Sequence, residues 1–116
     1  MSSRPMHYVR VECADGFSMS VQARESLYCT PRETNAPWYS EVEVGFPSAR
    51  EELLMDYCEE PQNPLETVYA YVPVGTVTNV IAKHGGMVAG EVPPGVAPLK
   101  ASRRQRSDPR FFSFFT

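Results

Sequence analysis

The stretch VECADGFSMSVQA, residues 11–23, contains two alternating runs on either side of Asp15-Gly16. A two-residue turn at Asp15-Gly16 would place apolar residues opposite polar ones on both faces of the ribbon. A three-residue loop, Ala14-Asp15-Gly16, with the glycine in the left-handed region, avoids this conflict. The resulting register pairs apolar residues three times: Cys13 with Phe17, Val11 with Met19, and Val9 with Val21. We therefore expect an antiparallel hairpin with one apolar face.

The opposite face of this hairpin is polar and consists of Tyr8, Arg10, Glu12, Ser18, Ser20, Gln22 and Arg24. A ribbon with one apolar and one polar face is typical of an antiparallel sheet that covers a core on one side and faces water on the other. We expect the hairpin to be half-buried in this way.

Further strands follow from the same alternation. After a loop over residues 25–37, the segment WYSEVEVGF (38–46) predicts a third strand with five side chains on one face: Trp38, Ser40, Val42, Val44 and Phe46. The segment TVYAYV (67–72) predicts a fourth strand, and residues 87–92 predict a short last one. Pro47 ends the third strand.

Two helices are predicted between these strands. Ser48 and Glu51 have the spacing of a capping box and predict a helix over residues 49–59, with Leu53 and Leu54 on its apolar side. A second helix starts at Pro73, which suits a first helical position, and ends before Gly85. The fold class is α+β: an antiparallel sheet of four to five strands with two short helices on one face and an extended C-terminal tail.

The 116 residues fit one domain with a modest core. We place this α+β domain at residues 1–92 and interpret residues 93–116 as a Pro-rich linker and a basic, aromatic tail. Residues 1–92 contain six Arg or Lys and thirteen Asp or Glu, whereas residues 93–116 contain five and one. The body is therefore acidic and the tail basic.

Three cysteines, Cys13, Cys29 and Cys58, form no close pair. An odd number beside apolar residues argues against a disulfide framework or a zinc site and favours reduced thiols in the cytosol. The sequence has no long apolar run, so we expect neither a secretion signal nor a membrane span.

Catalytic candidates are few. Cys29, near Arg32, has the features of a nucleophile, but spacing places no histidine beside it, and a buried structural cysteine is the simpler interpretation. His84 precedes a glycine cap, where its charge suits the helix C-terminus. Gly85-Gly86 closes a helix instead of opening one and so does not predict a phosphate loop. We expect no enzyme activity, no metal and no cofactor.

Seven carboxylates within twenty residues form the main binding candidate: Glu41, Glu43, Glu51, Glu52, Asp56, Glu59 and Glu60. They predict one acidic surface that binds a basic partner. The alternative is a solvated face that only aids solubility.

The tail supplies the second binding candidate, with Arg103, Arg104, Arg106, Phe111, Phe112, Phe114 and Phe115. Four phenylalanines on an arm predict either docking on the body or contact with a partner. Alternating cationic and aromatic residues also suit single-stranded nucleic acid, although the acidic body disfavours this alternative.

The segments VEVGFPS (42–48), TVYAYVPV (67–74) and KHGG (83–86) resemble those of small accessory proteins of temperate bacteriophages. This resemblance implies a host-directed binding protein, a class that includes inhibitors of bacterial defence systems such as CRISPR complexes. The implied partner is a bacterial protein or protein–nucleic acid complex, with a homodimer as a further option. The resemblance implies no catalytic residue.

Overall fold

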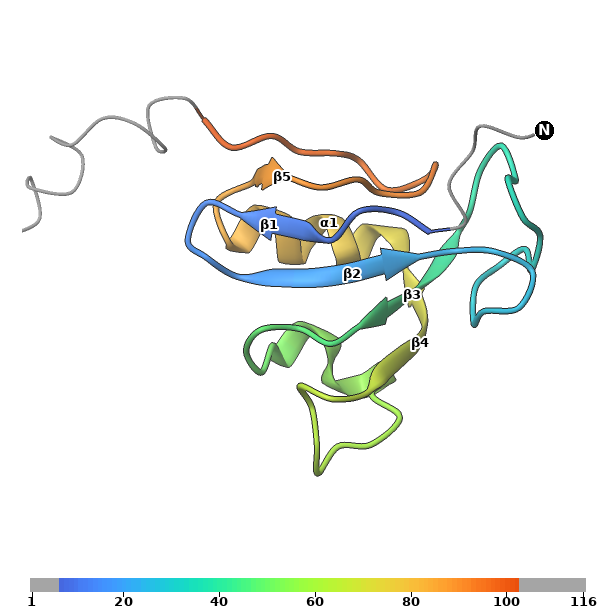
Figure 1. Cartoon of the computed structure of the whole chain (residues 1–116), viewed down its shortest axis with the longest axis horizontal. Helices are drawn as coiled ribbons and strands as arrows, with labels where there is room; N and C mark the ends of the chain where they lie inside the picture. The colour runs from blue at the N-terminus through green and yellow to red at the C-terminus, as the bar shows by residue number, and fades with distance from the viewer. Residues whose placement is uncertain (1–6, 103–116) are drawn as a thin grey trace, which may run out of the picture.

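The computed structural model describes residues 7–102, which form a five-stranded sheet with two helices. The strands are β1 (Val11–Cys13), β2 (Ser18–Gln22), β3 (Glu41–Gly45), β4 (Val68–Pro73) and β5 (Met87–Ala89). Their order is β4-β3-β2-β1-β5, and every neighbouring pair is antiparallel (Figure 1). The predicted α+β class is confirmed.

The helices are a 3-10 helix, η1 (Glu52–Tyr57), and an α-helix, α1 (Val74–Lys83). Because α1 follows β4 and precedes β5, it crosses from one edge of the sheet to the other, and in Figure 1 it lies behind β1 and β2. Leu54 of η1 and Val77, Val80 and Ile81 of α1 belong to one core cluster with the inward residues of the strands. Neither helix within residues 7–102 is long and apolar enough to cross a membrane.

The hairpin has the predicted register. Val11 lies opposite Met19, the Cys13 amide donates to the Phe17 carbonyl at 2.8 Å, and Gly16 has a φ of 98°. The prediction that Val9 shares the buried face is wrong, because Val9 is exposed. Its backbone pairs with Glu91 outside the strand, through a 3.0 Å bond from the Glu91 amide.

Alternation in the third and fourth strands is broken where the backbone leaves the regular strand conformation. Val42 and Val44 are buried as predicted, but Trp38 is 65% exposed and Phe46, with a φ of 50°, is 50% exposed. The β3–β4 register shifts between Val42 and Val44. In β4 a φ of 53° at Tyr71 reverses the alternation, so both Tyr69 and Val72 face the core.

The predicted helix over residues 49–59 is wrong in type and bounds. The Ser48 hydroxyl accepts a hydrogen bond from the Ser18 amide at 2.9 Å, so Ser48 extends the pairing of β2 and caps no helix. Glu51 is the N-cap of η1 instead. Since a 3-10 helix has three residues per turn, Leu54 points into the core while Leu53, predicted on the same apolar side, is exposed.

Residues 93–102 are packed against the sheet, so the predicted domain end at Val92 is too early. Val96 is buried, and the Tyr39 amide donates to the Pro94 carbonyl at 2.9 Å. The Met87 amide donates to the Leu99 carbonyl at 2.7 Å, which adds this segment beside β5. The domain extends at least to residue 102.

Candidate functional site

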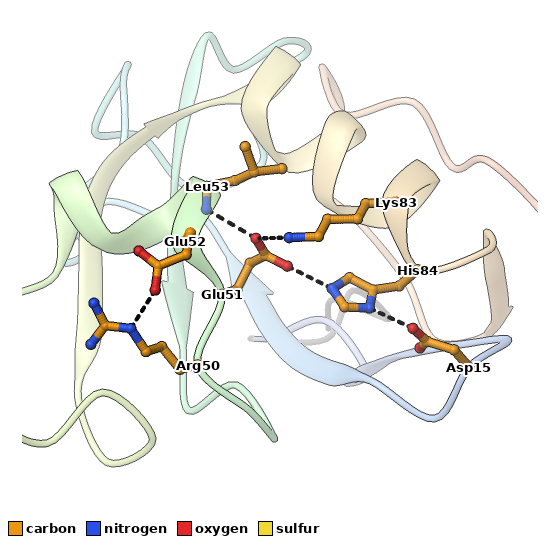
Figure 2. Close-up of polar contacts among 7 residues, drawn as sticks. All are labelled: Asp15, Arg50, Glu51, Glu52, Leu53, Lys83 and His84. Atoms are coloured by element: carbon orange, nitrogen blue, oxygen red, sulfur yellow. Dashed lines mark hydrogen bonds and ion pairs between the residues drawn. The ribbon is translucent and has the colours of Figure 1, made fainter.

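Glu51 is the centre of a polar cluster between η1, α1 and the β1–β2 turn. Its side chain is 2% exposed. Oε2 accepts hydrogen bonds from the Leu53 amide at 2.9 Å and from Lys83 Nζ at 2.8 Å, and Oε1 lies 2.6 Å from His84 Nε2 (Figure 2). The prediction that Glu51 belongs to an exposed acidic surface is therefore wrong: its two cationic partners stabilise it in a buried position.

His84 lies between two carboxylates. Its Nδ1 is 2.6 Å from Asp15 Oδ2, opposite the Glu51 contact (Figure 2). Ionised carboxylates only accept hydrogen bonds, so each ring nitrogen must carry a hydrogen and the ring is an imidazolium. The Phe17 ring stacks on it, with centroids 4.1 Å apart and planes at 11°. Neither ring nitrogen is free to act as a base.

The hairpin turn is held against the end of α1 by its backbone as well. The Asp15 amide donates to the His84 carbonyl at 3.2 Å, and the Ala14 amide donates to the Gly86 carbonyl at 2.9 Å. A Cβ at Gly85 would lie 3.0 Å from the Ala14 Cβ at a φ of 92°, so this close approach favours glycine. These contacts place Asp15 beside the ring.

Both carboxylates of the cluster are ionised at neutral pH. Burial acts to raise the pKa of Glu51, but hydrogen bonds from Lys83, the Leu53 amide and His84 outweigh it and lower that pKa. Burial also acts to raise the pKa of Asp15. Hydrogen bonds from the Phe17 amide and from His84 have the larger effect, so the pKa of Asp15 is lowered too. With Lys83 and the imidazolium, the four charges of the cluster cancel.

An open hollow of about 260 Å³ lies beside the cluster. It is lined by Asp15, Gly16, Phe17, Ser48, Ala49 and His84. Among residues 7–102, no group of three His, Cys, Asp or Glu side chains is arranged to hold a metal ion. The hollow thus combines a half-exposed carboxylate, a hydroxyl and an aromatic pair.

The cysteines are free thiols. Burial, together with the nearby charge of Asp15, raises the pKa of Cys13 to about 11. Burial also raises the pKa of Cys29, whose thiol donates to the Arg24 carbonyl at 3.2 Å. Cys29 therefore has the environment of a structural cysteine and not of an activated nucleophile.

The predicted acidic surface is divided in the structure. Glu41 and Glu43 lie on the sheet face opposite the buried Val42 and Val44, where they brace a loop: Glu41 accepts from the Thr30 hydroxyl at 2.7 Å, and Glu43 accepts from the Tyr28 amide at 3.1 Å. With Glu51 buried, four exposed carboxylates remain, and we call them the acidic face: Glu52, Asp56, Glu59 and Glu60.

The acidic face lies on a short segment fixed at both ends. Glu51 caps the start of η1. After the end of η1, Cys58 forms an isolated antiparallel β-bridge with Tyr69, and the Glu59 amide donates to the Val68 carbonyl at 3.0 Å. The three-residue period aligns the exposed Leu53 with Asp56. Arg50 pairs with Glu52 at 2.5 Å, and both of these side chains are exposed.

Arg103, Arg104, Arg106, Phe111, Phe112, Phe114 and Phe115 lie outside the described residues. Comparison of the chain with protein-family models, with curated proteins and with solved structures found no match.

Proposed function

We propose that this chain is a non-catalytic binding protein that engages a basic surface of another macromolecule through the acidic face. The observation that carries the proposal is the concentration of four exposed carboxylates within nine residues, Glu52 to Glu60, on a segment fixed at both ends. An exposed leucine, Leu53, lies among them and adds apolar contact area.

The fixed segment favours binding because little order remains to be imposed on it. The Glu51 cap holds its start and the β4 edge holds its end, so its backbone is organised before a partner arrives. Association then costs less conformational entropy than it does for a mobile loop. The buried cluster thus supports the acidic face, although Glu51 is not part of it.

Electrostatics also favours a basic partner. Residues 7–102 contain six Arg or Lys and thirteen Asp or Glu, a net charge of −7 without the histidines. Near the acidic face Arg50 is already paired with Glu52. A negative field of this kind accelerates association with a positive surface and is weakened by salt.

The phage resemblance indicates the class of partner. A host-directed phage protein binds a bacterial protein or protein–nucleic acid complex in the host cytoplasm. CRISPR complexes, which are one such host target, have basic surfaces that accommodate nucleic acid. Such a surface is complementary in charge to the acidic face.

A quantitative pull-down tests the proposal. Immobilised wild-type protein is incubated with bacterial lysate at low and high salt, next to Asp56→Lys/Glu60→Lys and the matched control Glu25→Lys/Glu33→Lys. Both variants change the net charge equally, and all four positions are exposed. We expect the wild type and the control to retain the same partner and the acidic-face variant to lose it.

Truncation after Ser102 completes the test. It removes the basic, aromatic tail and keeps the segment 93–102 that packs on the sheet. If truncation abolishes binding while Asp56→Lys/Glu60→Lys leaves it intact, the acidic face is not the binding site. The tail is then the recognition element, as the nucleic-acid alternative requires.

A further inference from the structure

We propose that His84 is a proton-dependent latch: when its ring loses a proton, the Asp15 side chain is released while the contact with Glu51 persists. The ring connects two segments that are distant in sequence, the β1–β2 turn and the start of η1, to the end of α1 (Figure 2). This inference goes beyond the acidic face and holds with or without a partner bound there.

The charge balance of the cluster makes it sensitive to this proton. With an imidazolium the charges of Asp15, Glu51, Lys83 and His84 cancel. A neutral ring leaves one excess negative charge and places a nitrogen lone pair 2.6 Å from a carboxylate oxygen. Two acceptors at this distance repel each other, so one of the two contacts must lengthen.

The surroundings of the two carboxylates decide which contact lengthens. Glu51 is 2% exposed and is also held by Lys83 and the Leu53 amide. The Asp15 side chain is 51% exposed and can exchange its bond to the ring for water. A neutral ring therefore keeps its hydrogen on Nε2 toward Glu51 and releases Asp15.

The other titratable or charged groups near the ring do not account for a pH response in place of His84. In the hairpin, burial keeps the Cys13 thiol neutral, with a pKa of about 11. Next to Glu51, Arg50 and Glu52 pair with each other in solvent. Lys83 is engaged with Glu51, and Lys100, beside Gly86, is exposed. Histidine is the side chain that changes charge in the physiological pH range.

The release is local and alters the hollow. Backbone bonds from the Asp15 and Ala14 amides still hold the turn on α1. Asp15, Phe17 and His84 all line the hollow, so a freed carboxylate and an altered ring stack change both its charge and its shape. The latch thus makes this surface respond to pH without unfolding the domain.

Nuclear magnetic resonance on the full chain with His7→Gln, which leaves one histidine, tests the latch. Ring nitrogen and backbone amide resonances are followed from about pH 5 to about pH 8. We expect both ring nitrogens to carry hydrogens at the acidic end. As Nδ1 loses its hydrogen, the Phe17 amide, which donates to Asp15 Oδ1, should shift with the same midpoint while the Leu53 amide stays in place.

Two isosteric variants sharpen this test. In Asp15→Asn the amide nitrogen can donate to Nδ1 of a neutral ring while the amide oxygen accepts from the Phe17 amide, so the Phe17 amide should keep its bond at the alkaline end of the titration. In Glu51→Gln a neutral ring keeps its Asp15 bond, which should likewise preserve the Phe17 bond. A Leu53 shift without a Phe17 shift in the wild type would show that Glu51 is released instead, and ring deprotonation that moves neither amide would overturn the latch.

Discussion

Glu51 Oε1 and His84 Nε2 lie 2.6 Å apart although 33 positions separate the two residues in the chain. One is the N-cap of η1 and the other the C-cap of α1, so this contact joins the ends of the two helices. Both helices contribute side chains to the core, and η1 carries the acidic face. The cluster therefore links core packing to the position of the proposed binding surface.

Replacing Glu51 with alanine should lower the free energy of unfolding by about 3 kcal/mol, because it removes one partner of a buried charge pair together with a helix cap. Urea denaturation measures the change. Glu52→Ala is the matched control: its carboxylate is exposed and pairs only with exposed Arg50, so we expect little effect. An equally small effect of Glu51→Ala would show that the cluster contributes nothing to stability.

The domain should lose stability in acid. The pKa values of Asp15 and Glu51 are lowered from ordinary values of 3.8 and 4.5. Lowered carboxyl pKa values contribute stability that is present above the unfolded values and is lost as pH falls through the folded ones. The urea concentration at the midpoint of unfolding should decrease as the pH is lowered below about 4.5. The decrease should be less steep in Asp15→Asn/Glu51→Gln. An unchanged slope in that variant would contradict the assignment.

Local signals predicted the hairpin well. Alternation on both sides of Asp15-Gly16 and the left-handed preference of glycine specify the loop without reference to the rest of the chain. Phe46 and Tyr71 broke the pattern because non-glycine residues there adopt positive φ, which neighbouring residues do not announce. Residues 93–102 contain three prolines and a glycine, which are typical of a linker, and only tertiary contacts, the burial of Val96 and the close approach of Gly95 to Tyr39, make them part of the domain.

The polar cluster shows more clearly what cannot be predicted from the sequence. Ser48 and Glu51 have capping-box spacing, but Ser48 is engaged by β2 and Glu51 by α1, so a correct local pattern indicated the wrong helix start. Asp15 lies 69 positions from His84. Only the tertiary arrangement brings a turn acid, a cap acid and a helix-end histidine together, and each one alone has an ordinary local role.

Thiol reactivity should separate the three cysteines. Burial raises the pKa of both Cys13 and Cys29, so few thiolates form there near neutral pH, whereas Cys58 is only half-buried. A disulfide reagent at mildly alkaline pH should modify Cys58 in the native protein and all three cysteines in denaturant. Cys58→Ser should abolish the native reaction. Rapid native labelling of Cys29 would instead support the nucleophile alternative.

Two glycines with similar backbone angles should respond differently to alanine. Gly95 has a φ of 112°, and a Cβ there would lie 2.1 Å from the Tyr39 carbonyl oxygen, whereas Gly16 has a φ of 98° and open space around it. Gly16→Ala should cost about 1 kcal/mol, the backbone penalty alone. Gly95→Ala must also displace residues 93–96 from Tyr39, so the loss of stability should be at least twice as large. Urea denaturation of both variants provides the comparison. Equal effects would mean that residues 93–102 do not pack on the sheet and that the domain ends at Val92 after all.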